Sequence, residues 1–444
     1  MVRILYWNLR DFTNNKIANA APPPGAAFGY AGPGQGPERL AWMLNTMGSG
    51  VLLGAAFVPD FIVVVEVERG AAVGPGYPVG GTAATGVMNL LNAINGDPVL
   101  NMGGARAWNL VPPLSLGKRN VAEGIAVFYN STDWYFIGPQ SRNATYAPPF
   151  AAALPLPARI IPVGRRFGQT ITQENRLQGQ WHYTSLKRQR YANVPTTVQF
   201  PNRNSRPPWL TSFSSVAGPP TLLRLLSIHT SPQWADGGTR AIRNIDTLMG
   251  AYTAARQIDV VMGDFNVDGT AAATWAAGGS YAYLVGNEPA GNANPPYAAA
   301  VRPPVGLNAQ YNSYYRTHSP NALGNCIVET GAGGQAGFPP GYRYLNESLD
   351  NIFYRTNIGG VPANANATII NRATGTPYAA AAGPPVPAPY RGTVTYAANM
   401  NMTMAAIVAN IGGGMIDPNA DLQEWDNFGR MHSTSDHLPI VVQI

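Results

Sequence analysis

The sequence is poor in cysteine, in lysine and in charged residues. Its 444 residues include one cysteine, Cys326, which excludes an internal disulfide. Nothing near that thiol would activate it, so a buried or incidental cysteine is favoured over a nucleophile. Charged residues make up 12% of the chain, and only three are lysines, so the net charge of +6 is almost all arginine. Arginine presents a planar fork of donors that matches phosphate.

The sequence also lacks a long apolar run. The longest candidate, residues 51–65, is interrupted by Pro59 and Asp60, so we expect no membrane span. The chain reaches its first predicted strand by residue 3, so we expect no signal peptide, and the protein would be cytoplasmic or exported by another route. A hydrophobic content of 45% supports a globular core, whereas Gly 49 and Pro 40 predict many long loops.

Short apolar strands recur from residue 3 to residue 444, without a repeat of fixed period or a clear linker. We therefore predict one domain, 1–444, with insertions near 138–200, 270–340 and 356–420. Helical spacing of Leu40, Met43, Leu44 and Met47 predicts a helix that starts near Pro37. A second helix is predicted to be capped by Thr239 and to bury a run of apolar side chains: Ile242, Ile245, Leu248, Met249 and Tyr252.

Polar side chains stand at or near the ends of the apolar strands. They are Asn8, Glu66, Glu123, His229, Asp264 with Asn266, Asp350, and Asp436 with His437. One such residue would usually be a cap or a core hydrogen-bonding group. Unpaired buried acids are costly, so the whole set indicates one shared polar site. Carboxylates and amides without cysteine suit Mg²⁺, with Ca²⁺ or Mn²⁺ as alternatives, rather than structural zinc. Two histidines with acidic partners suit proton transfer.

Eight motifs in this order resemble those of the endonuclease/exonuclease/phosphatase superfamily, most closely its deoxyribonuclease I type. They are Trp7-Asn8-Leu9-Arg10, Glu66 after an apolar strand, Arg119-Asn120 shortly before Glu123, Ser205-Arg206-Pro207-Pro208, Ile228-His229-Thr230-Ser231-Pro232, Gly263-Asp264-Phe265-Asn266, Leu349-Asp350 and Ser435-Asp436-His437. Gly-Asp-Phe-Asn alone would be a weak indication, and the specificity lies in the set. The resemblance implies a four-layer α/β sandwich of two mainly antiparallel sheets flanked by helices, with the site at one end.

The resemblance also implies roles for these residues in hydrolysis of a phosphodiester by water. His437, oriented by Asp350, would activate the water, and His229, oriented by Glu123, would protonate the leaving oxygen, although the sequence leaves the two roles interchangeable. Glu66 and Asn8 would hold the metal. The remaining residues, Asp264, Asn266 and Asp436, would place the phosphate, the water or a second metal. Arg10 and Arg206 would contact phosphate.

A basic segment favours nucleic acid as the substrate. Residues 159–206 contain nine arginines and lysines, among them Lys187, Arg188 and Arg190, and a single acid, Glu174. Cations without acids are the electrostatic footprint of phosphate binding. We therefore predict a Mg²⁺-dependent endonuclease that binds and cleaves DNA. The alternative is a phosphatase or phosphodiesterase of the same superfamily acting on a lipid or nucleotide phosphate. A catalytic role is not expected for the other histidines, such as His182.

Overall fold

The computed structural model describes the chain in sections, and most of the two central sheets lies within them. The described residues are 1–18, 35–48, 51–52, 55–70, 79–111, 113, 115–116, 122–138, 181–183, 188–191, 197–199, 206, 208–302, 313–315, 345–359, 367–370, 434–435 and 437–444. None of the described helices is long and apolar enough to cross a membrane.

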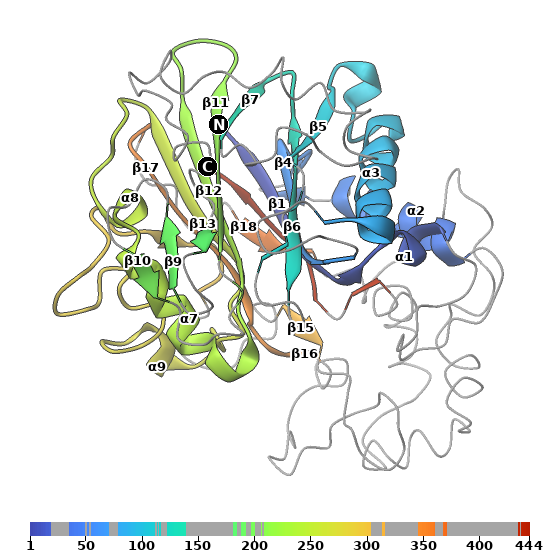
Figure 1. Ribbon diagram of the computed structural model, residues 1–444. Coiled ribbons are helices and arrows are strands. Elements are labelled where there is room, and N and C mark those ends of the chain that lie inside the picture. The colour runs from blue at the N-terminus through green and yellow to red at the C-terminus, as the bar shows by residue number, and fades with distance from the viewer. Residues whose placement is uncertain are drawn as a thin grey trace, which may run out of the picture.

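Two six-stranded sheets form the centre of the protein (Figure 1). The first has the order β18 (Ala367–Ile369), β19 (Ile440–Gln443), β1 (Arg3–Phe12), β4 (Phe61–Glu68), β6 (Glu123–Asn130) and β5 (Trp108–Val111). The second has the order β14 (Ala298–Ala299), β17 (Asp350–Thr356), β13 (Gln257–Asp264), β12 (Leu222–His229), β11 (Trp209–Ser215) and β7 (Trp134–Gly138). Within each sheet only the central pair is parallel, β1 with β4 and β12 with β13, so both sheets are mainly antiparallel.

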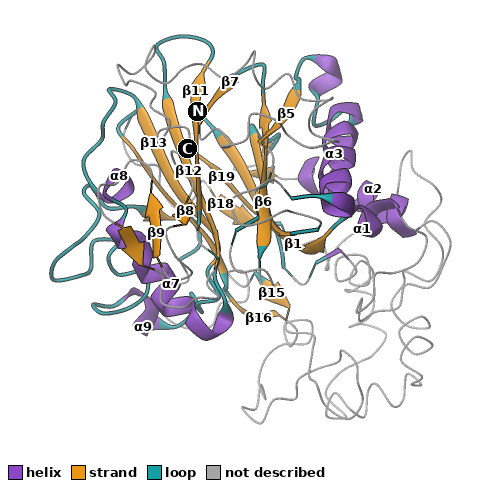
Figure 2. Ribbon diagram, in the orientation of Figure 1, coloured by secondary structure: helices purple, strands orange, loops and turns teal. Residues whose placement is uncertain are grey.

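Helices cover the outer face of each sheet (Figures 1 and 2). On the first sheet lie α1 (Asn14–Ala18), α2 (Gln35–Gly48) and α3 (Gly81–Gly96), and on the second lie α7 (Ala235–Ala241), α8 (Asp246–Met249) and α9 (Ala272–Trp275). Along β1, Leu5 and Trp7 pack under the helices, whereas Ile4 and Tyr6 pack between the sheets. Because both faces are buried, the strands read as continuous apolar runs. These layers confirm the predicted four-layer sandwich.

The helix predicted near Pro37 is present as α2, but the helix predicted to start at Thr239 is wrong. Thr239 is buried inside α7, and the chain then tightens into the 3₁₀ turn η4 (Ile242–Asn244) before α8. Ile242, Ile245 and Leu248 are all 0% exposed. Their spacing of three matches the three residues per turn of a 3₁₀ helix, so the tight turn keeps all three on the sheet.

The predicted insertions lie largely outside the described residues. Within 138–200, the structure describes a three-stranded sheet of β8 (Trp181–Tyr183), β9 (Arg188–Tyr191) and β10 (Thr197–Gln199). Two further short pairs are β2 (Val51–Leu52) with β3 (Ala55–Ala56), and β15 (Tyr314–Tyr315) with β16 (Leu345–Glu347). Residues 270–302 pack into the helical layer of the second sheet, and β18, from within 356–420, is the edge strand of the first.

Candidate active site

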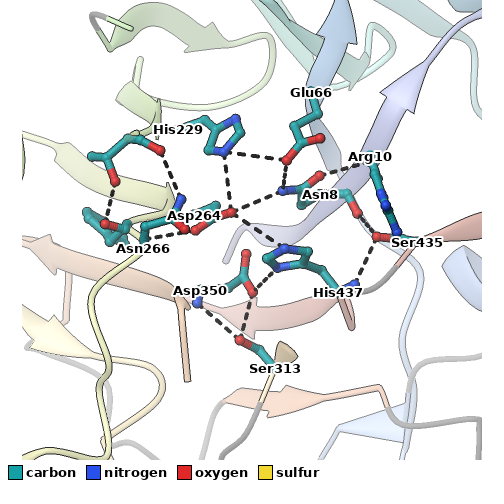
Figure 3. Close-up of polar contacts among 12 residues, drawn as sticks. Asn8, Arg10, Glu66, His229, Asp264, Asn266, Ser313, Asp350, Ser435 and His437 are labelled. Carbon is teal, nitrogen blue, oxygen red and sulfur yellow. Dashed lines mark hydrogen bonds and ion pairs between the residues drawn. The ribbon is translucent and has the colours of Figure 1, made fainter. Parts of the chain in front are cut away.

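The polar strand-end residues converge at one end of the sandwich, where both parallel strand pairs terminate (Figure 3). The first sheet contributes Asn8 from β1, Glu66 from β4, Glu123 from β6 and His437 just before β19, and the second contributes His229 from β12, Asp264 from β13 and Asp350 from β17. Asn8 joins the two sheets, because its Nδ2 donates to Glu66 Oε1 at 2.8 Å and to Asp264 Oδ2 at 3.1 Å. The described members of the sequence-predicted strand-end set therefore form a single cluster.

The backbone around this cluster is strained. Five described non-glycine residues have positive φ, and four of them adjoin the site: Arg10 at 40°, Asp11 at 49°, Glu66 at 58° and Asn266 at 48°. Such conformations cost roughly 1–3 kcal/mol each and persist only where the surroundings enforce them. The Arg10 N–H donates to Asn8 Oδ1 at 2.9 Å, and the Asp11 N–H donates to Glu66 Oε2 at 3.3 Å. The strained turn after Asn8 therefore orients the side chains of Asn8 and Glu66.

Glu66 shows how the strain serves the site. Strict alternation along β4 would place it beside Ile62 and Val64, under the helices. Instead, the register between β4 and β6 shifts between Val64 and Val67, and Glu66 takes a left-handed conformation. This bulge directs the carboxylate into the site while Val67 returns to the helix-covered face.

His229 is held between carboxylates on both sides of its ring. Its Nδ1 lies 2.7 Å from Glu123 Oε2, and its Nε2 points to Glu66 Oε1 at 3.4 Å and to Asp264 Oδ2 at 3.5 Å. Arg206 forms an ion pair with Glu123 at 2.5 Å, and its Nη1 is 3.0 Å from both ring nitrogens of His229. Arg206 thus lies where a cation can act on this histidine and on a bound anion together.

His437 is held from the interior of the protein. Its Nδ1 lies 2.7 Å from Asp350 Oδ2, and its Nε2 lies 3.6 Å from Asp264 Oδ2. Ser313 Oγ donates to Asp350 Oδ2 at 2.7 Å, and the Tyr6 hydroxyl donates to Asp350 Oδ1 at 2.9 Å. The structure therefore brings each histidine to the carboxylate that the resemblance assigns to it, with both Nε2 atoms facing Asp264.

Asp264 and Asn266 are fixed by the loop that follows β13. Asp264 Oδ1 accepts from the Asn266 N–H at 2.8 Å, and Asn266 Nδ2 donates to the carbonyl of Thr230 at 2.9 Å. The Thr230 hydroxyl donates to the Phe265 carbonyl, and the Thr230 N–H donates to the Asp264 carbonyl at 3.0 Å. The segments after β12 and β13 are therefore tied to each other beside His229.

The electrostatics separate the two central carboxylates. Burial raises the pKa of Glu66, but His229, Asn8, His437 and Arg206 outweigh it and lower that pKa to about 2. Burial raises the pKa of Asp264 to about 6; the charges of Asp350 and Glu66 add to this shift, and the two histidines oppose it. Burial lowers the pKa of His229, but Glu123 and Glu66 outweigh it and raise that pKa above the ordinary value for histidine. Strongly shifted pKa values in one cluster are typical of functional sites.

The donor set fits one hard cation. Glu66, Asp264 and His437 each offer a ligand atom, and these atoms lie within 4.8 Å of one another. Two carboxylates with a neighbouring amide suit Mg²⁺, Mn²⁺ or Ca²⁺. His437 has only Nε2 to offer, because its Nδ1 is bonded to Asp350. Glu66 and Asp264 are therefore the carboxylates that could hold the metal, and Asn8 Nδ2 donates to both of them.

Some predicted site residues cannot be placed in this cluster. Asp436 and Lys187 lie outside the described residues, and for Arg188 and Arg190 the structure describes the strand β9 but not the side chains. Two predicted phosphate-binding residues do adjoin the cluster. Arg10 lies two residues after Asn8 in β1, and Arg206 contacts His229 and Glu123.

Sequence reasoning missed several residues that support the site. Ser435 Oγ donates to the Asn8 carbonyl at 2.5 Å and accepts from the His437 N–H at 2.9 Å; it belongs to the Ser-Asp-His motif. Tyr6 shares the inner face of β1 with Asn8, as a period of two requires. Nothing in the sequence predicted a role for Ser313, because it follows a loop-like stretch and lies 37 residues before Asp350.

Trp234 was also missed, and it is unusual for a tryptophan. It is 44% exposed, whereas the other tryptophans whose side chains the structure describes are at most 7% exposed. It ends η3 (Pro232–Trp234), five residues after His229, and its backbone N–H donates to the Ser231 carbonyl at 2.9 Å. An exposed indole therefore lies close in the chain to the site.

Comparison with known proteins gave similarity at the level of structure. No family model matches the sequence, and no curated protein is similar to it. Similar solved structures include an endonuclease/exonuclease/phosphatase family protein from Bacteroides thetaiotaomicron, 11% identical, with 99% of this chain and 96% of that chain covered and a TM-score of 0.37. Members of the superfamily predicted from the sequence are among them.

Two further similar structures differ in their substrates. One is a mannosyl-6-phosphatase from Bacteroides thetaiotaomicron, 11% identical, with 100% of this chain and 99% of that chain covered and a TM-score of 0.38. The other is D. rerio TDP2 complexed with single strand DNA product, 12% identical, with 99% and 97% covered and a TM-score of 0.37. At such identities, the function of this protein must be argued from its own side chains.

Proposed function

We propose that this protein is a metal-dependent phosphodiester hydrolase and that its substrate is a nucleic acid, most simply DNA. One observation carries the hydrolase proposal: two imidazoles, each tied to a carboxylate at 2.7 Å, direct their Nε2 atoms at the same oxygen of Asp264, at 3.5 and 3.6 Å. A phosphate bound at that point would have a proton acceptor and a proton donor near it. This arrangement suits attack by water and departure of an alcohol.

In this mechanism each histidine moves one proton at Nε2. His437, whose Nδ1–H is held by Asp350, takes a proton from the attacking water. His229, whose pKa is raised, protonates the leaving oxygen. The carboxylates would fix the ring tautomers, because each accepts the proton at Nδ1 while Nε2 faces Asp264. When bound by Glu66 and Asp264, to which Asn8 donates its two amide hydrogens, a divalent cation would offset the charge that develops on the phosphate.

Cations and an exposed aromatic ring favour nucleic acid over a lipid phosphate. Arg206 adjoins His229, Arg10 adjoins Asn8, and residues 159–206 are strongly basic. Trp234, 44% exposed close to His229 in the chain, offers a surface on which a base can stack. A lipid headgroup requires neither a stacking surface nor so long a basic segment.

A substrate panel tests the proposal. Purified protein should cleave plasmid, single-stranded DNA or RNA and spare phosphoinositides and sphingomyelin, and a chelator should abolish cleavage. Strong turnover of a lipid phosphate without nuclease activity would replace the nuclease proposal with the phosphatase alternative.

The basic segment has its own test, which is the combined change of Lys187, Arg188 and Arg190 to Ala. If the segment follows a duplex backbone, log K falls with log salt by about 0.9 per neutralised phosphate, and the triple variant should show a flatter slope. Hydrolysis of a small phosphodiester should stay nearly unchanged. Arg256→Ala is the control, because Arg256 precedes β13 at the end opposite Asp264, about 26 Å away along an eight-residue strand. An unchanged slope in the triple variant would refute a role for the segment.

A further inference from the structure

Asp350 is the most completely enclosed carboxylate of the site. It is 0% exposed, and its donors are two hydroxyls and one imidazole: Tyr6, Ser313 and His437. Among the described residues no arginine or lysine pairs with it. Each of its oxygens therefore depends on a specific neutral or imidazole donor, because burying a carboxylate without partners is costly.

The two histidine–carboxylate pairs are thus supported in different ways. Glu123, the partner of His229, is 19% exposed in its side chain and is bound by Arg206. Asp350, the partner of His437, is held from the core between the sheets. The first pair can respond to a bound anion through Arg206, whereas the second has a fixed environment.

Tyr6 supplies the part of this environment that Ser313 cannot. Ser313 and His437 both bond to Oδ2 of Asp350, at 2.7 Å each, whereas Tyr6 bonds to Oδ1 at 2.9 Å. A carboxylate held at one oxygen can still rotate about its Cβ–Cγ bond. A donor on the other oxygen stops that rotation. Tyr6 is itself 0% exposed and packed among the apolar side chains between the sheets, so its hydroxyl has little freedom to move.

We propose that Tyr6 is a positioning residue of the site: through its bond to Oδ1 it locks the Asp350 carboxylate and thereby fixes the tautomer and ring orientation of His437. This inference rests on the proposed function for its kinetic consequence, but its structural part does not. Among the described residues the Tyr6 hydroxyl hydrogen-bonds only to Asp350, so its effect would pass through Asp350 and His437. Small misplacements of a reacting group are enough to reduce rates strongly.

Tyr6→Phe tests the proposal, because it removes one hydroxyl and keeps the ring. We expect kcat to fall by roughly 10- to 100-fold, the range that loss of one hydrogen bond to a charged group corresponds to, with KM unchanged. In the His437→Ala background, Tyr6→Phe should cause no further loss in kcat, because its effect passes through that imidazole. Equal losses in both backgrounds, or an unchanged kcat in the single variant, would overturn the proposal.

Two measurements separate this role from a purely structural one. Tyr283→Phe is a matched control, because Tyr283 is a buried tyrosine whose hydroxyl donates to the Thr239 carbonyl at 2.7 Å in the outer layer; it should lose similar stability and keep kcat. Nitrogen NMR of His437 should show one tautomer in the wild-type protein and a mixture in Tyr6→Phe. An unchanged tautomer would refute the proposal, even if the wild-type protein hydrolysed no phosphodiester and the proposed function failed.

Discussion

Gly263 lies where the fold and the site depend on each other. It stands opposite Ile228 in the parallel pair of β12 and β13, directly before Asp264. Its φ is +157°, and a Cβ added there would lie 1.9 Å from the Ile228 carbonyl oxygen and 2.8 Å from its carbonyl carbon. Real Cβ atoms do not approach heavy atoms below 3.0 Å. In Gly263→Ala the two strands would therefore have to separate by about 1 Å, since backbone, unlike a flexible side chain, cannot turn aside.

The expected cost has two parts. Overpacking in a well-packed core costs about 1–3 kcal/mol, and the unfavourable φ adds about 1–3 kcal/mol. We expect denaturant unfolding to show a loss of about 2–6 kcal/mol. The same displacement would move Asp264 relative to His229, whose Nε2 lies 3.5 Å from Asp264 Oδ2. An error of 1 Å in the position of a reacting group can lower the rate about 100-fold. Hydrolysis by the folded variant should therefore fall by about that factor.

Gly278→Ala is the control for this substitution. Gly278 also has positive φ, +81°, but nothing lies within 4 Å of an added Cβ. It should lose only the cost of the backbone conformation and keep full activity. Equal unfolding midpoints for the two variants, with activity retained in Gly263→Ala, would refute the argument that close strand approach determines both stability and site geometry.

Three further predictions concern the chemistry. Glu66→Gln should keep the fold but lose most activity and most affinity for Mg²⁺ or Mn²⁺ in calorimetry, because it removes a charged ligand at nearly constant size; full activity, or activity insensitive to EDTA, would contradict the metal assignment. His229→Ala and His437→Ala should each lower kcat by about 10²- to 10⁴-fold, whereas His182→Ala should cost little; a loss in His182→Ala as large as in His229→Ala would contradict the site. Glu123→Gln should shift the alkaline limb of the pH–rate profile to lower pH, because burial lowers the pKa of His229 and Glu123 is the strongest influence that raises it; a general acid is active when protonated, so its rate is lost as pH rises through that pKa, and an unmoved limb would indicate that His229 is not the acid.

The sequence by itself determined which segments form buried strands and which strand ends carry the polar site residues, whereas the four layers were implied by the resemblance of its motifs. The runs 61–65 and 440–442 are apolar without interruption, so they predict strands buried on both faces. A polar residue that ends a buried strand, such as His229 or Asp264, must lie at the end of the sheet where that strand terminates. These inferences hold because periodicity and strand ends are properties of neighbouring residues in the chain.

The resemblance paired each histidine with its carboxylate, but only the tertiary structure decided how these side chains are oriented and which others meet them. Glu66 points into the site because a bulge and a left-handed φ override the alternation of β4. Glu123 and His229 are 106 residues apart, Asp350 and His437 are 87 apart, and Tyr6 reaches Asp350 across 344 residues. Such contacts depend on the register of strands and on how two sheets pack, and neither is a property of any local stretch of sequence.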